Sequence, residues 1–279
     1  MTIAITGATG QLGRLALAAL KAKGHAPIAL ARDPAKAADL GLESRAFDYK
    51  ATATLVPALA GVSTLVLISS NDFDDRAGQH ANVIAAAKAA GVGRILYTSL
   101  LRADRSPMLL AADHKATEGA IHASGLAFTI LRNGWYTENH TGSLGGAIAA
   151  GALIGAAGEG RFSAATRADY AEAIAAAAAD AAHAGKTYEL ASDTAYSYAD
   201  LAAEVSRQTG KSIPYNDLPP GTYAGILEGF GLPAGFAHVL ADSDVQAGKG
   251  WLQDDSRTLS RLIGRPTTPL ATAVAAALS

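Results

Sequence analysis

The first 131 residues repeat one pattern, in which a short and mostly apolar run is followed by an alanine-rich segment with helical spacing. The apolar runs cover residues 3–6, 27–31, 44–47, 64–68, 94–98 and 128–131. Strands that are apolar on both faces are typical of parallel sheets covered by helices on either side. The pattern therefore predicts an α/β fold of the Rossmann type, with a doubly wound parallel sheet and right-handed crossovers.

The alternation loosens after Leu131, where glycines become frequent and the apolar runs become irregular. Helical spacing returns near residues 168–182, 198–208, 222–230 and 259–263, and a further strand is predicted near 187–190. We interpret this half as a smaller α/β lobe. The expected division is a Rossmann domain over 1–155 and a smaller lobe over 156–279, with some later segments returning to the sheet.

Composition narrows the classes of function. Hydrophobic residues make up 49% of the chain and charged residues 17%, which argues against disorder. With 23 Lys and Arg against 25 Asp and Glu there is no basic field, so we expect neither a nucleic-acid nor a membrane partner. The chain has no cysteine, so redox chemistry requires a bound organic cofactor. Its first residues lack a basic targeting segment, which predicts a cytoplasmic protein, and the sequence leaves the oligomeric state open.

A glycine-rich turn, Gly7-Ala8-Thr9-Gly10-Gln11-Leu12-Gly13, follows the first predicted strand and opens a helix. In a dinucleotide-binding turn the first glycine permits the tight bend, the second admits the pyrophosphate and the third lets helix and strand pack closely. The helix N-terminus adds free N–H groups and a positive dipole. A glycine turn without a ligand is the alternative. We assign the cofactor-binding turn to Gly7, Ala8, Thr9, Gly10, Gln11 and Leu12.

Two cations after the second predicted strand favour NADP(H) over NAD(H). Arg32 stands where an acidic residue would bind the ribose 2′-hydroxyl, and its guanidinium suits a 2′-phosphate. Lys36, one turn further on, is expected to assist. The neighbouring Asp33 leaves the opposite preference open. Asp48, after the third strand, is a candidate partner of the adenine amino group, with a plain surface carboxylate as the alternative.

Several motifs, including the glycine turn, together indicate one protein family. They are Gly7–Gly13, Arg32-Asp33-Pro34-Ala35-Lys36, Leu67-Ile68-Ser69-Ser70, Tyr97-Thr98-Ser99-Leu100, Leu131-Arg132-Asn133-Gly134-Trp135-Tyr136, and Ala165-Thr166-Arg167-Ala168-Asp169-Tyr170. With them the chain resembles the NmrA-like atypical short-chain dehydrogenases nearly end to end. Within that family it is most similar to the bacterial NAD(P)H:quinone oxidoreductases and the triphenylmethane dye reductases.

The resemblance implies an NADPH-binding core and a C-terminal lobe that closes a cleft over the nicotinamide. It implies that Ser69, Ser70 and Ser99 line the dinucleotide. It further implies that Asn133, Gly134, Trp135 and Tyr136 approach the nicotinamide half.

The usual acid of short-chain dehydrogenases, a Tyr-x-x-x-Lys pair, is missing, since none of the nine tyrosines is followed four residues later by lysine. Reduction of an isolated ketone creates a localised alkoxide that needs such an acid. Hydride transfer to a quinone or a cationic dye spreads the charge over a conjugated system. The missing pair therefore favours conjugated acceptors, with the protein supplying proximity, orientation and a dry cleft.

His114, Glu118 and His122 share one face of the helix predicted after the fifth strand. A metal site there is disfavoured, because the two histidines lie two turns apart, about 12 Å along a straight helix, so we predict no metal. His114 lies near the expected place of the missing tyrosine, which makes it the candidate catalytic residue. A solvated face or a structural hydrogen bond is the alternative.

Three aromatic residues are candidates for the wall of the substrate site. Trp135 and Tyr136 follow the sixth predicted strand, where a flat acceptor could stack on them. Phe73, in the loop after the fourth strand, is placed to close the other side. Core packing is the alternative for these rings.

The sequence as a whole predicts an NADPH-dependent oxidoreductase that transfers hydride directly to a quinone. The first alternative is a reductase of triphenylmethane dyes or other conjugated electrophiles. The second is an NmrA-like regulator that senses NADP(H) without catalysis.

Overall fold

The structure, a computed structural model, describes residues 1–72 and 74–279, and it forms two compact units. The first unit comprises residues 1–103, 113–133 and 167–188. The second unit comprises residues 104–112, 134–166 and 189–279. The chain thus leaves the first unit and returns to it. A boundary near residue 155 between separately folding domains stays a prediction.

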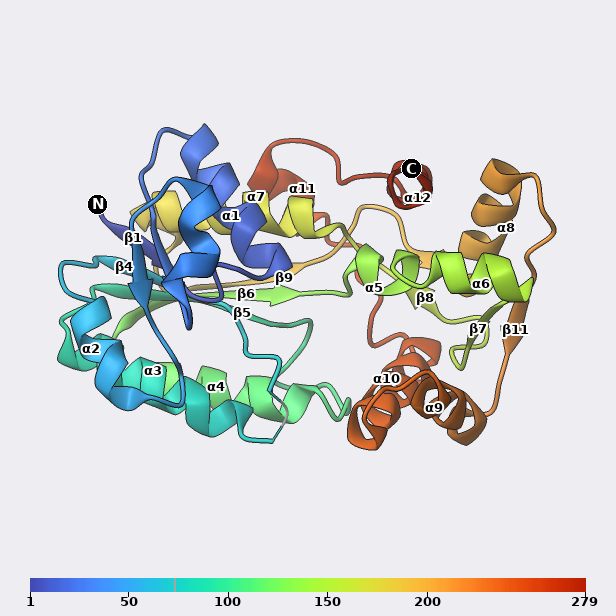
Figure 1. Cartoon of the computed structure of the whole chain (residues 1–279), viewed down its shortest axis with the longest axis horizontal. Helices are drawn as coiled ribbons and strands as arrows, with labels where there is room; N and C mark the ends of the chain where they lie inside the picture. Colours follow the sequence, from blue (N-terminus) through green and yellow to red (C-terminus); the bar gives the residue numbers. More distant parts are fainter. Residues whose placement is uncertain (73) are drawn as a thin grey trace. The chain divides into compact units, whose positions relative to one another are not determined.

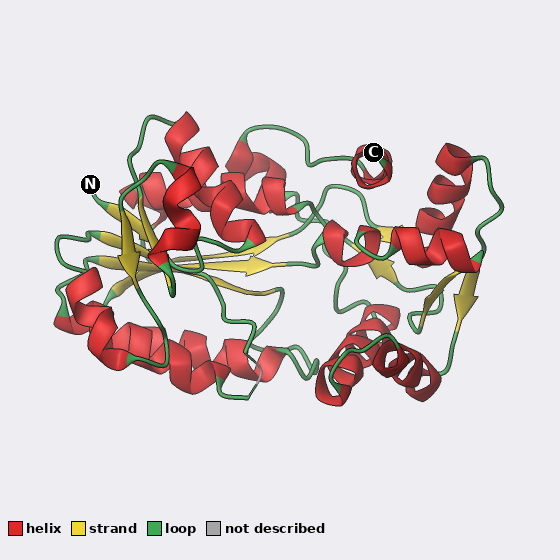
Figure 2. Cartoon of the chain, in the orientation of Figure 1, coloured by secondary structure: helices red, strands yellow, loops and turns green. Residues whose placement is uncertain are grey.

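A seven-stranded sheet has the order β3-β2-β1-β4-β5-β6-β9 and confirms the predicted α/β fold (Figure 2). Its strands are β1 (Ile3–Ile5), β2 (Ile28–Ala31), β3 (Ser44–Ala46), β4 (Thr64–Leu67), β5 (Arg94–Leu100), β6 (Ala127–Asn133) and β9 (Lys186–Leu190). Strands β1 to β6 pair in parallel. β5 and β6 run two residues beyond the predicted ends because they pair continuously from Arg94↔Ala127 to Leu100↔Asn133.

Helices cover both faces of this sheet (Figure 1). They are α1 (Gln11–Ala22), α2 (Leu55–Ala58), α3 (Arg76–Ala89), α4 (Ala111–Ser124) and α7 (Arg167–Ala179), with short 3₁₀ helices η1 (Pro34–Leu40), η2 (Thr52–Thr54) and η3 (Ala181–His183). α1 and α7 pack together on one face, and α2, α3 and α4 lie on the other. α1 buries Leu12, Ala16, Leu17 and Leu20, which recur at helical spacing and therefore form one apolar stripe.

The second unit contains two small sheets and several helices. β7 (Leu153–Gly155) pairs in parallel with β11 (Tyr215–Asp217), and β8 (Arg161–Phe162) pairs antiparallel with β10 (Tyr196–Ser197). The helices are α5 (Thr137–Thr141), α6 (Leu144–Ala150), α8 (Tyr198–Thr209), α9 (Pro220–Gly229), α10 (Ala234–Gly248), α11 (Thr258–Ile263) and α12 (Leu270–Leu278). The helices predicted near residues 198–208, 222–230 and 259–263 are confirmed as α8, α9 and α11, whereas the one predicted near 168–182 is α7 of the first unit.

Four helices of the second unit, α5, α6, α10 and α12, were not predicted. α10 carries only a weak amphipathic pattern, and tertiary packing stabilises it. Its Ala237 and Ala241 pack with Ala224 of α9 in one buried cluster. Local propensity is a weak guide where a helix depends on such a partner.

No helix within the described residues is long and apolar enough to cross a lipid bilayer.

Candidate functional site

The order of the sheet places the candidate cofactor site at the carboxyl ends of its central strands. β1 pairs with β2 on one side and with β4 on the other, so the chain winds outward in both directions from the β1/β4 pair. In open α/β sheets this switch point leaves a crevice for ligands. The predicted residues after β1, β2, β3 and β4, and those at the ends of β5 and β6, therefore share one edge of the sheet.

The glycine turn leads directly from β1 into α1. Gly7 has φ = +60°, in the left-handed region that glycine adopts without strain. Its carbonyl accepts a hydrogen bond from the Gly10 N–H at 2.9 Å, which closes the turn. Gly10 is the N-cap of α1 and offers no side chain to its first N–H groups. Those N–H groups and the helix dipole are suited to a phosphate.

Gly13 is required by the close approach of α1 to the turn. A Cβ atom at this position would lie 2.2 Å from the Gly7 carbonyl oxygen. At Gly10 the corresponding distance is 3.2 Å, a tight contact but a smaller one. The packing role predicted for the third glycine thus has a direct geometric basis.

The segment after β2 presents two cations to solvent. Arg32 and Lys36 are exposed, and no side-chain hydrogen bond or ion pair engages either of them in the described part of the chain. Asp33 is the N-cap of η1, and its carboxylate accepts the Ala35 N–H at 3.1 Å. Asp33 therefore has a structural task, which weakens the alternative in which it would bind a ribose hydroxyl.

Arg14 of α1 ties the glycine turn to this cationic segment. Its guanidinium donates to the Thr9 carbonyl at 3.3 Å, to the Lys36 carbonyl at 2.9 Å and to the Asp39 carboxylate at 2.6 Å. The ion pair holds the pKa of Asp39 below its usual value. Arg14 thus connects the phosphate turn to the candidate 2′-phosphate segment, a role that no motif in the sequence indicates.

Asp48, after β3, is half-buried, and one of its carboxylate oxygens accepts the Lys50 N–H at 3.0 Å. The next residue, Tyr49, is also half-buried, and its hydroxyl hydrogen-bonds Thr6 and the Ile68 carbonyl. Tyr49 thereby links the end of β1 to the end of β4. Whether Asp48 meets an adenine stays a prediction.

Ser69 and Ser70 form the turn after β4, and both are half-buried. The Ser69 N–H donates to Thr98 Oγ1 at 3.0 Å. The Ser70 hydroxyl donates to Gln79 Oε1 at 3.0 Å and accepts the Asp72 N–H at 3.1 Å. Protein groups thus engage both the single donor and one acceptor position of the Ser70 hydroxyl.

Ser99 belongs to a buried charge network. Its hydroxyl donates to Glu118 Oε1 at 2.5 Å, and Arg132 of β6 donates to both oxygens of the same carboxylate at 2.9 and 2.6 Å. Ser99 and Glu118 are each 5% exposed. Glu118 is therefore a bidentate partner of Arg132 rather than part of a solvated helix face.

His114 is buried, and its Nδ1 lies 2.8 Å from the hydroxyl of the buried Tyr97. Burial lowers the pKa of His114 below its ordinary value, and the nearby Arg76 guanidinium acts in the same direction. Burial also raises the pKa of Tyr97. Both groups are consequently neutral near pH 7, so His114 can exchange hydrogen bonds but is a poor cationic acid.

The third member of the predicted helix face, His122, is exposed and packs against the ring of Phe128 with centroids 4.4 Å apart. His114, Glu118 and His122 thus have three different environments. No group of three potential metal ligands occurs among the described residues.

The remaining predicted residues follow β6. Asn133 is buried, and its carbonyl accepts the Leu101 N–H at 2.8 Å. In the second unit, the Gly134 N–H donates to the Leu190 carbonyl at 2.7 Å. Trp135 is 7% exposed, and Tyr136 is half-buried at the start of α5. Phe73, the other predicted wall residue, lies outside the described residues.

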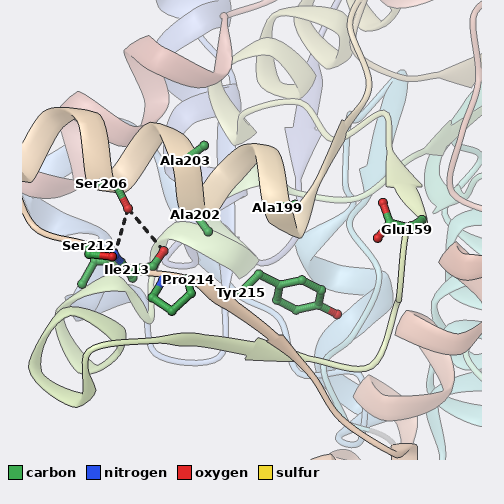
Figure 3. Close-up of a pocket in the computed structure, with 9 residues that line it drawn as sticks. All are labelled: Glu159, Ala199, Ala202, Ala203, Ser206, Ser212, Ile213, Pro214 and Tyr215. Carbon is green, nitrogen blue, oxygen red and sulfur yellow. Dashed lines mark hydrogen bonds between the residues drawn. The ribbon is translucent and has the colours of Figure 1, made fainter.

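A pocket of about 410 Å³ lies between α8 and the segment before β11 in the second unit (Figure 3). It is lined by Glu159, Ala199, Ala202, Ala203, Ser206, Ser212, Ile213, Pro214 and Tyr215. The Ser206 hydroxyl is engaged with the backbone of Ile213. None of the predicted site residues lines this pocket.

Comparison with known proteins agrees with a nucleotide-binding assignment. Residues 7–181 match a family described as NAD(P)H-binding. Over 277 residues the chain is 52% identical to quinone oxidoreductase 2 of Escherichia coli (strain K12), covering 98% of this chain and 97% of that protein.

Two solved structures are similar over almost their full length. The NADPH-dependent quinone oxidoreductase of Escherichia coli, complexed with NADPH, has a TM-score of 0.96 at 51% identity and covers 99% of this chain and 100% of its own. The triphenylmethane reductase of Citrobacter sp., complexed with NADP(H), has a TM-score of 0.92 at 37% identity, with 99% of each chain covered.

Proposed function

The chain belongs to the NAD(P)H-binding, NmrA-like family, and from this membership we infer that it is an NADPH-dependent oxidoreductase that reduces quinones. Identity of 52% over nearly the whole length of an Escherichia coli quinone oxidoreductase supports catalysis rather than cofactor sensing alone. The similarity to that enzyme in complex with NADPH supports the choice of cofactor.

The observation that carries the proposal is the conjunction of the open glycine turn with two unengaged cations at one edge of the sheet. The N-terminus of α1, reached through Gly7 to Leu12, would hold the pyrophosphate. Arg32 and Lys36 would hold the 2′-phosphate, because neither is committed to a protein partner in the described structure. Asp48 would meet the adenine, and Ser69, Ser70 and Ser99 would line the middle of the dinucleotide.

The proposed substrate class follows from the missing Tyr-x-x-x-Lys acid and from the neutral pair of His114 and Tyr97. The chemistry that NADPH would bring is donation of a hydride. No Tyr-x-x-x-Lys pair is present to protonate a localised alkoxide. His114 and Tyr97 form a neutral hydrogen-bonded pair, so we assign His114 as a hydrogen-bond partner of the acceptor rather than a strong acid. Asn133, Gly134, Trp135 and Tyr136 are proposed to orient the ring system.

A second acceptor class is favoured by one specific observation, the 37% identity to a triphenylmethane reductase over 99% of both chains. A cationic dye, like a quinone, accepts hydride into a conjugated system. Steady-state oxidation of NADPH with benzoquinones, naphthoquinones and triphenylmethane dyes ranks the two classes directly.

The experiment that tests the cofactor assignment is Arg32→Glu, assayed with NADPH and NADH. Because Arg32 is exposed and unengaged, the substitution should leave the fold intact. Loss of a charge-assisted contact and repulsion of the phosphate should lower kcat/KM for NADPH by about a hundredfold, a change of about 2.7 kcal/mol, and should change it much less for NADH.

Lys211→Glu provides the matched control, since it makes the same charge change at an exposed position of the second unit. It should leave both cofactors within about twofold of the parent protein. Equal loss with NADPH and NADH in Arg32→Glu would contradict the 2′-phosphate role. No turnover of NADPH with any conjugated acceptor would contradict the reductase itself.

A further inference from the structure

We propose that Arg76, Gln79 and His80 of α3 form a positioning clamp that fixes the Ser69–Ser70 turn for NADPH binding. The inference rests on the proposed function, in which this turn lines the cofactor, and it assigns a task to three residues outside the predicted site. They are positioning residues because they act through Ser70, by its backbone or its hydroxyl.

The clamp engages each polar group of Ser70. His80 Nε2 accepts the Ser70 N–H at 2.9 Å, Arg76 Nε donates to the Ser70 carbonyl at 2.7 Å, and Gln79 Oε1 accepts the Ser70 hydroxyl at 3.0 Å. The three side chains come from the first two turns of one helix, and each is no more than 4% exposed. Three independent buried contacts on one residue leave its backbone little freedom.

The protonation state of His80 is fixed by its two partners. Since Nε2 accepts a hydrogen bond, the proton of the neutral ring lies on Nδ1, which is 2.9 Å from Thr117 Oγ1. The Thr117 hydroxyl donates a hydrogen bond to the Asp113 carbonyl oxygen at 2.8 Å, so its own oxygen can accept one from His80 Nδ1. The chain of donors and acceptors is consistent from Ser70 through α3 to α4.

The start of α3 is itself held in place. Asp75 is the N-cap, and its carboxylate accepts the Gly78 N–H at 3.1 Å. Further along the helix, Val83, Ile84 and Ala87 are buried in the core. The polar clamp therefore extends the buried stripe of α3, so the position of the turn is coupled to the packing of the whole helix.

The Ser69–Ser70 turn lies where the cofactor is proposed to bind, so fixing the turn should affect NADPH binding. Ser69 and Ser70 follow β4, the strand next to β1 at the switch point of the sheet. Affinity for a cofactor is gained when its contacts are held in the bound geometry beforehand. The Ser70 hydroxyl is used by Gln79 and by the Asp72 N–H, so its contribution to NADPH should come from positioning.

The first test compares His80→Leu with His80→Gln, using direct titration of NADPH. Leucine fills the space but leaves the Ser70 N–H without its acceptor, whereas the glutamine amide can supply one oxygen and one N–H. We expect His80→Leu to raise the NADPH Kd about tenfold and His80→Gln to recover most of that loss. At saturating NADPH, kcat should stay within about twofold of the parent protein.

His140→Leu is the matched control, because His140 is also buried and uses Nδ1 to hydrogen-bond a neighbour, Tyr196, at 2.8 Å in the second unit. It should lower the melting temperature and leave the NADPH Kd within twofold. The clamp is overturned if His80→Leu lowers the melting temperature as His140→Leu does but binds NADPH like the parent protein.

A double-mutant cycle between Ser70 and Gln79 provides a second test if His80→Leu does not fold. If both side chains act through one contact, Ser70→Ala, Gln79→Leu and the double variant should each raise the NADPH Kd about threefold. If the increases in Kd of the two single variants multiply in the double variant, the Ser70 hydroxyl contacts NADPH directly. If neither single variant changes the Kd, the turn needs no clamp. Either result overturns the proposal.

These measurements separate the clamp from the function on which it rests. A parent protein that does not bind NADPH contradicts the proposed function. A parent protein that binds NADPH, with variants that bind it equally well, contradicts only the clamp.

Discussion

At the residue scale, the glycine turn illustrates how one missing side chain determines the approach of two elements. Gly7 takes a left-handed conformation, Gly10 begins α1, and Gly13 brings the helix backbone against the Gly7 carbonyl. The three glycines have different physical tasks, so their tolerance to substitution should differ. Gly13 faces the most severe steric limit of the three, because its added Cβ would come within 2.2 Å of a backbone atom.

We expect Gly13→Ala to destabilise the protein, whereas Gly119→Ala should not. An added methyl group at Gly13 must displace α1 from the turn, at a cost of about 1–3 kcal/mol, and should weaken NADPH binding. Gly119 lies within α4, where a new Cβ meets nothing within 4 Å, so alanine should stabilise the helix by up to about 1 kcal/mol.

Thermal unfolding monitored by circular dichroism, together with NADPH titration, measures both variants under one condition. A melting temperature for Gly13→Ala equal to that of the parent protein would show that α1 moves at no cost.

Single residues also mark the limit of what the sequence predicts. The spacing of Gly7, Gly10 and Gly13 predicts their local turn, because the constraint involves neighbours in the chain. The hydrogen-bond partners of His114, Glu118 and Ser70 could not be predicted, because these residues meet groups from other elements. A weak signal existed for the clamp, since Arg76, Gln79 and His80 continue the helical spacing of the buried Val83, Ile84 and Ala87.

At the scale of elements, a buried ion pair joins α4 to the central strands. Glu118 of α4 accepts two hydrogen bonds from Arg132 of β6 and one from Ser99 of β5. The side chains of Glu118 and Arg132 are only 7% and 12% exposed. A pair of this kind fixes the register of the helix on the sheet, because neither charge can be left without its partner inside the protein.

Glu118→Gln should therefore lower the free energy of unfolding by about 3 kcal/mol, since it leaves the Arg132 guanidinium facing an uncharged amide. Glu204→Gln on α8 is the control, because Glu204 pairs with the exposed Arg207 three residues away on the same helix. Its effect should be much smaller, since solvent screens that pair.

Urea unfolding of the two variants and the parent protein measures the difference. Comparable losses of unfolding free energy in both variants would mean that burial does not increase the contribution of the Glu118–Arg132 pair to stability.

Helices and strands were predicted correctly where their own residues show an apolar pattern. They were missed where packing on another element stabilises them. Strands β1, β2 and β4 were recognised because they are apolar runs that are buried throughout. Helix α8 was recognised from its helical spacing, and the structure adds a capping box of Ser197 and Asp200 at its start. α10 was missed because its stability comes from packing on α9. On the face shared by His114 and Glu118, a catalytic His114, a solvated face and structural bonding all stayed open, because the partners come from β5 and β6.

At the scale of the whole molecule, buried ionisable groups determine how the free energy of unfolding depends on pH. Burial lowers the pKa of His80 and of His140 to about 3, so protonation of the unfolded chain below about pH 6.5 destabilises the folded state. Asp244 of α10 acts in the opposite sense. Burial raises its pKa to about 6, although the Ala156 N–H and the Tyr198 hydroxyl donate to its carboxylate at 2.9 and 3.0 Å.

The sign of the Asp244 contribution follows from its higher pKa in the folded state. Folding favours the protonated carboxyl, so its stabilising effect is complete below about pH 4 and is lost as the pH rises through about 6. Above that range the protein holds a buried carboxylate at a cost of about 3 kcal/mol, for a pKa shift of about two units. The nearby Asp217 carboxylate adds to this cost.

Asp244→Asn should therefore match the parent protein at pH 4 and exceed its unfolding free energy by about 3 kcal/mol at pH 8. Asparagine resembles the protonated carboxyl, because its oxygen can accept the Ala156 N–H. Tryptophan fluorescence suits the measurement, since both tryptophans, Trp135 and Trp251, lie in the second unit with Asp244. His80 and His140 are common to both proteins, so their pH dependence cancels in the difference. A difference that stays constant from pH 4 to pH 8 would show that the Asp244 carboxylate is solvated in the folded protein.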